Sequence, residues 1–243
     1  MKKVGFIGFG NMAQAIITGL IESGNFSNDD ICVYDTDGDK VKIASEKFNI
    51  TVFENNEQLV DNAECITLAV KPNALQALLT SISDQLRKVN PLVISIAAGQ
   101  SIDKLKNFMG YDAKIIRVMP NINAIAGKAV SGYAFSEKVC EADIILAEKI
   151  LSSFGKCVEV SEEKFSAYSA IAGCSPAYSY IFADAVARVG VKYGITKKEA
   201  LDIVTESIIE TVKNGCKNES TEMKKTVLNA IEAAYIKDKE LGK

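Results

Sequence analysis

Three small residues near the N-terminus have the spacing of a site that binds a dinucleotide. Gly8, Gly10 and Ala13 follow the apolar run of residues 3–7 at once and open an apolar helical segment near Asn11. In such a strand–turn–helix unit the first glycine permits a sharp turn, the second lets a pyrophosphate approach the backbone, and the third small residue lets helix and strand pack closely. The N–H groups and positive dipole end of the helix favour phosphate. The pattern predicts a dinucleotide site, and the alternative is an ordinary strand–helix turn.

An acidic residue stands where the ribose of a dinucleotide is expected. Asp35 comes just after the second apolar run, 22 residues beyond Ala13. A carboxylate at this place accepts a hydrogen bond from the ribose 2′-hydroxyl and repels a 2′-phosphate, which favours NADH over NADPH. The alternative is that Asp35 only caps the turn formed by residues 35–38.

The composition leaves few side chains for protein-based catalysis. The chain of 243 residues contains no His, and its six Cys are scattered without a C-x-x-C pair. The commonest general base and the usual Ser–His and Cys–His pairs are therefore absent, and a zinc site is not expected. The sequence predicts that a cofactor supplies the chemistry and that no metal is bound.

Charge and hydropathy indicate which partners to expect. The net charge is −3, and no basic cluster offers a footprint for nucleic acid. Apolar runs are shorter than the ~18 residues of a membrane span. The first strand begins at residue 3, which leaves no room for a signal peptide, and scattered cysteines are typical of reduced packing residues. We expect a cytoplasmic protein with small-molecule ligands, no nucleic acid and no membrane.

Alternating apolar and helical segments predict an α/β fold with a doubly wound parallel sheet of the Rossmann type. The expected strands are residues 3–7, 30–34, 51–53, 64–70, 92–96 and 114–119, with added strands at 129–135 and 157–160. The expected helices are residues 11–23, 40–48, 56–61, 73–86 and 137–152. Ligands bind such sheets at the carboxyl ends of the strands.

After Val160 the sequence has no further runs typical of strands, and its apolar residues have helical spacing. Residues 163–172 are helical by spacing, residues 173–174 break the helix, and Ser175 restarts it as an N-cap before Pro176. We therefore expect a dinucleotide-binding domain over residues 1–160 and an all-helical substrate and dimerisation domain over residues 161–243.

The helical domain has a capping box and two long amphipathic segments. Thr196 and Glu199 form the capping box, and a last helix is expected over residues 221–241. A helical domain of about eighty residues often completes its core by pairing with a second subunit. We therefore expect a homodimer through this domain, or a higher oligomer.

Six motifs together resemble pyrroline-5-carboxylate reductase, the NAD(P)H enzyme that makes proline. The motifs are residues 5–12, 69–72, 95–99, 117–121, 176–178 and 232–235. Their order and spacing cover nearly the whole chain. The resemblance implies a dinucleotide domain followed by a helical domain that interlocks with its mate in a dimer, and NAD(P)H as the cofactor.

The resemblance also implies which residues form the site. The expected cofactor contacts, joined by Asp35 from the spacing argument, are Gly8, Gly10, Asn11, Met12, Asn56, Ala69, Val70, Lys71, Pro72 and Asn121. Ala97 would border the nicotinamide, and the expected substrate contacts are Ala98, Gly99 and Ser175.

The chain departs from the family pattern in three places. Residues 172–175 read Ala-Gly-Cys-Ser where the family has Ser-Gly-Ser-Gly, and residues 119–123 end in Ile-Asn where the family has Thr-Pro. The family's Ser-Pro-Gly-Gly-Thr-Thr segment, which holds the substrate carboxylate and places a threonine by the ring nitrogen, is absent. Only the polar stretch of residues 213–220 stands in its place. The chain keeps the cofactor half and lacks much of the family's substrate half.

The reaction implied by the resemblance is hydride transfer from the reduced nicotinamide to the carbon of a cyclic C=N bond, which yields a ring amine. Protonation of the imine nitrogen supplies the activation, so the protein chiefly positions the two rings. Lys71 and Tyr178 are candidates for a general acid. Lys71 at a strand end also suits a structural or cofactor-facing role, and Tyr178 on an apolar helix face also suits packing.

Two other functions are alternatives to this interpretation of the sequence. A β-hydroxyacid dehydrogenase has the same layout but needs a lysine on the first long helix of the second domain, and residues 178–184 supply none. The other alternative is an NAD(P)-binding paralogue that has lost reductase activity and serves in sensing or binding. The missing carboxylate-binding segment is the feature that favours it.

Overall fold

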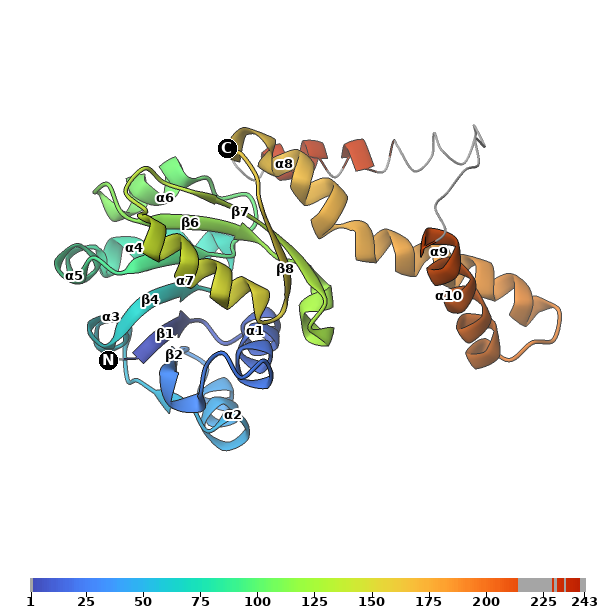
Figure 1. The fold of residues 1–243 in the computed structure, drawn as a ribbon, viewed down its shortest axis with the longest axis horizontal. Helices are drawn as coiled ribbons and strands as arrows, with labels where there is room; N and C mark the ends of the chain where they lie inside the picture. Colours follow the sequence, from blue (N-terminus) through green and yellow to red (C-terminus); the bar gives the residue numbers. More distant parts are fainter. Residues whose placement is uncertain (1, 214–228, 230, 234, 241–243) are drawn as a thin grey trace.

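A twisted eight-stranded sheet forms the first part of the computed structural model, which describes residues 2–213, 229, 231–233 and 235–240 (Figure 1). The spatial order of the strands is β3-β2-β1-β4-β5-β6-β7-β8. The strands are β1 (Lys2–Ile7), β2 (Ile31–Tyr34), β3 (Thr51–Val52), β4 (Ala63–Leu68), β5 (Leu92–Ser95), β6 (Ile115–Met119), β7 (Ala129–Phe135) and β8 (Gly155–Glu159). The predicted Rossmann-type sheet is confirmed.

The last two strands run against the other six. β1 to β6 are parallel, β7 pairs with β6 in the antiparallel sense, and β8 is parallel to β7. Only the short 3-10 turn Ile122–Ala126 and its flanks connect β6 to β7. A parallel crossover needs a dozen or more residues, so this short connection returns the chain antiparallel.

Helices cover both faces of the sheet. One face is covered by α1 (Asn11–Glu22), α2 (Gly38–Phe48) and α7 (Glu141–Ser152). The other face is covered by α3 (Asn56–Asn62), α4 (Leu75–Ser81), α5 (Ser83–Val89) and α6 (Ile102–Met109). Successive strand residues such as Phe6 and Ile7 are both buried, one toward each layer. Such continuous apolar strands are typical of a sheet covered on both sides.

Two expectations for this layer were wrong. The helix predicted over residues 73–86 is divided into a 3-10 turn, Pro72–Ala74, and the helices α4 and α5. The chain breaks at Ile82, and Leu79, Ile82 and Leu86 are all buried in the layer on this face of the sheet. Helix α6 was not predicted, although Ser101 caps it by accepting a hydrogen bond from the Lys104 amide.

The helical part begins after β8 and extends away from the sheet (Figure 1). It comprises α8 (Phe165–Tyr168), a π-helical turn (Ser169–Gly173), α9 (Ser175–Lys192) and α10 (Lys197–Lys213), which packs against α9. The predicted break is present at Cys174, which lies between the π-helical turn and α9, whereas Gly173 still belongs to the π-helical turn. Ser175 is not an N-cap, since Cys174 holds that position and the Ser175 hydroxyl donates to the Ile171 carbonyl.

The capping box of α10 is present as predicted. The Thr196 amide and hydroxyl both donate to the Glu199 carboxylate, and the Glu199 amide donates back to the Thr196 hydroxyl. Of the predicted last helix, residues 229, 231–233 and 235–240 are helical, and the rest lies outside the described residues, as does the polar stretch 214–220. None of the helices that the structure describes is long and apolar enough to cross a bilayer.

A partly buried ion pair joins the sheet to the helical part. Arg117 on β6 donates to Glu162 at 3.1 Å, and the same carboxylate oxygen accepts the Ile102 amide at 2.8 Å. The Arg117 guanidinium also lies 4.4 Å from the centre of the Phe165 ring. Farther along, the Ser169 hydroxyl donates to Asp238 at 3.2 Å, so the C-terminal helical residues return to this junction.

Candidate active site

The glycine turn after β1 has the geometry that a dinucleotide site requires. Gly8 has a φ of +97°, and a Cβ there would lie 2.7 Å from the Ala69 carbonyl oxygen, so only glycine fits. Gly10 is different, because a Cβ at this position would meet nothing within 4 Å. Protein packing therefore does not explain Gly10. The open space above it lies where a bound phosphate is expected.

The start of α1 offers free hydrogen-bond donors to that space. Gly10 occupies the N-cap position, and no side chain in the described part of the chain caps the helix. The first turn carries no acidic residue. The first N–H groups of a helix have no partner within it and, together with the helix dipole, favour an anion. These residues fit the pyrophosphate of a nicotinamide dinucleotide.

A cavity of about 180 Å³ opens beside this turn, at the carboxyl ends of β1, β2 and β4. It is lined by Ile7, Gly8, Tyr34, Asp35, Thr36, Asn56, Val70, Ala74 and Leu78. Gly8, Asp35, Asn56 and Val70 were predicted to contact the cofactor, and the fold brings all four together. The buried Asn56 Oδ1 has no hydrogen-bond partner among the described residues, so it has an acceptor to offer to a ligand.

Asp35 has contacts that fit both interpretations of its role. Its Oδ2 accepts the Phe9 amide at 2.7 Å and lies 3.6 Å from the Lys40 ammonium, and its Oδ1 accepts the Asp37 amide at 2.9 Å. The carboxylate therefore braces the glycine turn and caps its own turn. It also lines the cavity where a ribose would lie.

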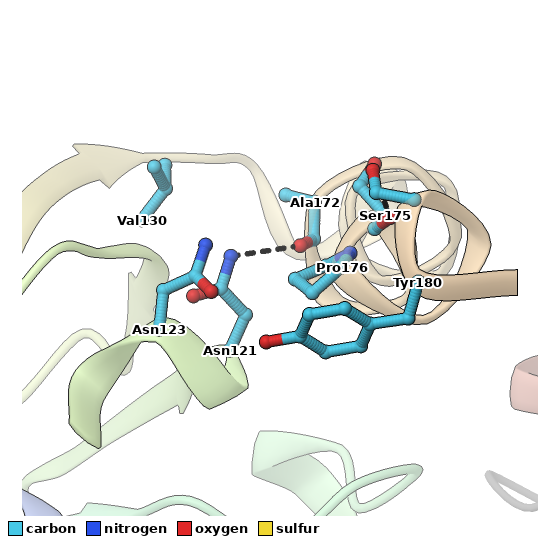
Figure 2. A pocket seen from close by; sticks show the side chains of 8 residues that line it. Asn121, Asn123, Val130, Ala172, Ser175, Pro176 and Tyr180 are labelled. Carbon is cyan, nitrogen blue, oxygen red and sulfur yellow. Dashed lines mark hydrogen bonds between the residues drawn. The ribbon is translucent and has the colours of Figure 1, made fainter. Parts of the chain in front are cut away.

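A second cavity, of about 410 Å³, lies between the turn after β6 and the start of α9 (Figure 2). Its polar lining is Asn121, Asn123, Ser175, Ser179 and Tyr180, and its apolar lining is Val130, Ala172 and Pro176. The buried Asn121 Nδ2 donates to the Ala172 carbonyl at 3.0 Å, which ties the β6 turn to the π-helical turn. The fold thus brings the predicted cofactor residue Asn121 to the predicted substrate residue Ser175.

The remaining predicted residues lie around these two cavities. Lys71 and Pro72 line a separate depression with Gln100 and Lys104. Asn11 and Met12 begin α1, and Ala69 follows β4, where its amide donates to the Ile7 carbonyl. Ala97 to Gly99 form the turn after β5, with Ala97 buried and Gly99 at a φ of +70°.

Neither candidate for a general acid lies in the lining of the second cavity. Tyr178 is half-buried on α9. Burial first, and then the neighbouring Cys174 thiol, raise the pKa of Tyr178, so its hydroxyl keeps its proton at neutral pH. Lys71 is exposed beside the depression described above. No cluster of three or more metal-ligating side chains occurs within the described ranges.

Sequence reasoning missed three polar residues of the second cavity, namely Asn123, Ser179 and Tyr180. Ser179 and Tyr180 follow Pro176 by three and four positions, so all three share one face of α9. That helical spacing could have indicated Ser179 and Tyr180 from the sequence. Asn123 was visible only as a departure from the family pattern.

Comparisons with known protein families match both parts of the chain. A family model described as NADP oxidoreductase, coenzyme F420-dependent, matches residues 3–99. A model described as pyrroline-5-carboxylate reductase dimerisation matches residues 162–227. The pyrroline-5-carboxylate reductase of Escherichia coli is 34% identical over 212 residues, which cover 87% of this chain and 78% of that protein.

Solved structures agree with the sequence comparisons. A pyrroline-5-carboxylate reductase from Coxiella burnetii superposes with a TM-score of 0.89 at 26% identity, and the match covers 100% of this chain and 99% of that one. The Plasmodium falciparum pyrroline carboxylate reductase, solved with NADP bound, has the same TM-score at 27% identity, over 100% and 98% of the two chains.

Proposed function

The chain belongs to the pyrroline-5-carboxylate reductase family, and we propose that it transfers hydride from NAD(P)H to pyrroline-5-carboxylate to give proline. The observation that carries this proposal is the 34% identity to a named reductase over 87% of the chain, through both the sheet and the helical part. The uncapped start of α1, with open space above Gly10, supports the cofactor half of the proposal.

In this proposal the protein binds the cofactor and the imine and orients them toward each other. The reduced nicotinamide supplies the hydride, and the protonated imine accepts it. The N–H groups at the start of α1 hold the pyrophosphate, and the turn of residues 97–99 limits where the ring can lie. The Asn121 amide lines the second cavity and bonds to the Ala172 carbonyl. Catalysis then derives chiefly from holding two rings at the right distance.

The test is NADH oxidation by the purified protein with pyrroline-5-carboxylate, with NADPH in a parallel series. Saturable turnover with proline as the product is expected. NADH binding without turnover on this imine or other cyclic imines would instead support the non-catalytic paralogue. Oxidation of a hydroxy acid with NAD⁺ would point to the hydroxyacid dehydrogenase alternative, which the membership in the reductase family already disfavours.

We propose further that Asp35 makes the enzyme prefer NADH. Its carboxylate lines the cofactor cavity and would repel a 2′-phosphate. Asp35→Asn keeps an acceptor oxygen for the turn but removes the charge, so the ratio of kcat/KM for NADH to that for NADPH should fall about tenfold or more. Asp39→Asn, an exposed neighbour on α2 that does not line the cavity, is the control. An unchanged ratio in Asp35→Asn would remove Asp35 from the ribose site.

The domain division and the dimer are also part of this proposal. We place the boundary near Val160, with the dinucleotide domain over residues 1–160 and the helical domain over residues 161–243. The end of β8 at Glu159 and the start of the matching dimerisation model at residue 162 support this division. We propose that the helical domain forms a homodimer, and that higher assemblies build on it.

An exposed apolar face on α9 and α10 supports the dimer. A cleft of about 510 Å³ between the two helices has an apolar lining that includes Phe182, Val189 and Ile203. These three side chains are exposed in the single chain. Exposed apolar patches of this kind are typical of protein–protein interfaces.

Ile203→Asp should convert the dimer to a monomer at micromolar concentration, because a carboxylate would be buried without a partner at the interface. Light scattering on the purified variant measures this. Ile145→Asp, at an exposed isoleucine on α7 of the sheet domain, should leave the mass of the assembly unchanged. A monomeric wild-type protein, or a dimeric Ile203→Asp variant, would contradict this interface.

We propose the cytoplasm as the site of action. The five cysteines of the described chain, Cys32, Cys65, Cys140, Cys157 and Cys174, form no disulfide bond with one another. Reduced cysteines are typical of proteins in a reducing compartment. Cell fractionation tests this placement directly.

A further inference from the structure

We propose that the cavity between the β6 turn and α9 holds the carboxylate of the substrate, with the Asn123 amide and the Tyr180 hydroxyl as its donors. This inference rests on the proposed function, because it assumes a cyclic imine that bears a carboxylate. It answers a question that the sequence raised, namely what binds the carboxylate in a chain that lacks the family's segment for that purpose.

The chain's departures from the family pattern meet at this cavity. Ala172, Ser175 and Asn123 each stand where the family motif has a different residue, and all three line this one cavity. The first two come from the π-helical turn and α9, whereas Asn123 comes from the turn after β6. Changes in two separate motifs therefore meet in a single cavity, on either side of the Asn121 to Ala172 hydrogen bond.

Two of the hydrogen-bond donors that line the cavity are not used within the described part of the protein. The Ser175 hydroxyl donates to the Ile171 carbonyl, and the Ser179 hydroxyl donates to the Ser175 carbonyl at 3.0 Å, so both protons are committed within the helix. The side chains of Asn123 and Tyr180 make no hydrogen bond with any described residue. Figure 2 shows the Tyr180 hydroxyl pointing toward the side chains of Asn121 and Asn123. The two donors thus line the cavity from its two walls, Asn123 from the turn after β6 and Tyr180 from α9.

The electrostatic surroundings of the cavity favour an anion. None of the described residues that line the cavity is acidic, so nothing there repels an anion. The cavity also lies at the N-terminal end of the 18-residue helix α9, whose dipole adds positive potential. Neutral N–H and O–H donors bind a carboxylate well, since hydrogen bonds to a charged acceptor are about twice as strong as neutral ones.

The buried Asn121 completes the arrangement. Its Oδ1 has no partner in the described part of the chain, although the residue is buried. A buried acceptor of this kind needs a donor. In pyrroline-5-carboxylate the protonated ring nitrogen is bonded to the carbon that bears the carboxylate. One ligand can therefore donate its N–H to Asn121 while its carboxylate accepts from Asn123 and Tyr180.

Tyr180→Phe and Asn123→Pro test the subsite, and the second restores the family residue. Each should raise KM for pyrroline-5-carboxylate about 10- to 100-fold, the loss expected for a hydrogen bond to a charged group, with kcat within about threefold. KM for NADH should not change. Tyr180 is 64% exposed, so removal of its hydroxyl should not affect folding.

The control is Tyr193→Phe, at the end of the same helix, where the tyrosine is 77% exposed and lies outside the cavity. Its KM for pyrroline-5-carboxylate and its kcat should equal those of the wild type. A second substrate, 1-pyrroline, lacks the carboxylate. The variants should turn it over as well as the wild type does, so the preference for the carboxylated imine should fall in the variants alone.

Direct binding separates failure of the subsite from failure of the proposed function. L-proline and pyrrolidine share a ring and differ in the carboxylate, and calorimetry with NAD⁺ present measures both. Wild-type protein should prefer proline, and Tyr180→Phe should lose that preference. Normal turnover with unchanged KM in both variants would overturn the subsite but leave the reductase. Proline binding that depends on Tyr180, without turnover, would overturn the reductase but leave the subsite. If the wild-type protein shows no turnover and no carboxylate-dependent binding, both the subsite and the reductase function are overturned.

Discussion

Gly10→Ala should weaken NADH binding about 100-fold, or about 2.7 kcal/mol, while the free energy of unfolding changes by less than about 1 kcal/mol. The backbone at Gly10 has a φ of −77° and a ψ of −179°, which alanine adopts without strain. A Cβ there meets no protein atom within 4 Å. The methyl group would instead fill the space at the start of α1, where the pyrophosphate is proposed to lie.

Gly24→Ala is the matched control for this experiment. Gly24 follows the other end of α1 with a φ of +71°, and a Cβ there also meets nothing within 4 Å. Its replacement should cost about 1–2 kcal/mol of stability through the left-handed backbone and leave NADH affinity unchanged. Fluorescence titration with NADH and urea unfolding on both variants measure the two effects. NADH affinity at the wild-type level in Gly10→Ala would place the pyrophosphate elsewhere.

Glu162→Ala should lower the free energy of unfolding by about 3 kcal/mol. The side chain of its partner Arg117 is only 10% exposed, so the variant would leave a guanidinium buried without its carboxylate. The Ile102 amide, which donates to the same oxygen, would lose its acceptor as well. Glu162 itself is 31% exposed, which places the expected loss at the lower end of the range for buried pairs.

Glu64→Ala provides the comparison at the surface. The Lys3–Glu64 pair is shorter, at 2.9 Å, but its side chains are 48% and 39% exposed. Solvent screens such a pair, so the loss should be much smaller than in Glu162→Ala. Glu162→Gln, which keeps an acceptor oxygen, should fall between the two variants. Urea unfolding followed by circular dichroism measures all three. If Glu162→Ala costs no more than Glu64→Ala, the partly buried pair does not hold the sheet and the helical part together.

Local patterns in the sequence were enough to predict the sheet and the cofactor turn. Six of the eight strands, β1, β2 and β4 to β7, have four to seven residues and were expected close to their observed places, because apolar runs of this length between turn signals are typical of buried strands. Gly8 was predictable for the same local reason, since the tight turn between β1 and α1 demands a positive φ. The Thr196 capping box is also encoded within four residues.

The errors occurred where a distant contact overrides a local preference. Ser175 was expected to cap α9, but the chain enters that helix from a π-helical turn, and Asn121 on another element holds the Ala172 carbonyl of that turn. The helix expected over residues 73–86 breaks at Ile82, although the spacing of its buried residues Leu79, Ile82 and Leu86 continues across the break. Helical periodicity alone therefore reveals neither feature.

The sequence by itself determined the fold class, the dinucleotide turn and the family. Only the tertiary structure decided which polar side chains share a cavity. Asn123 and Tyr180 are separated by more than fifty residues, and no motif connects them. They meet because β7 returns antiparallel beside β6 and the Asn121 amide ties the turn between those strands to the start of α9. Long-range packing of this kind depends on the whole chain, so it has no signature at either position.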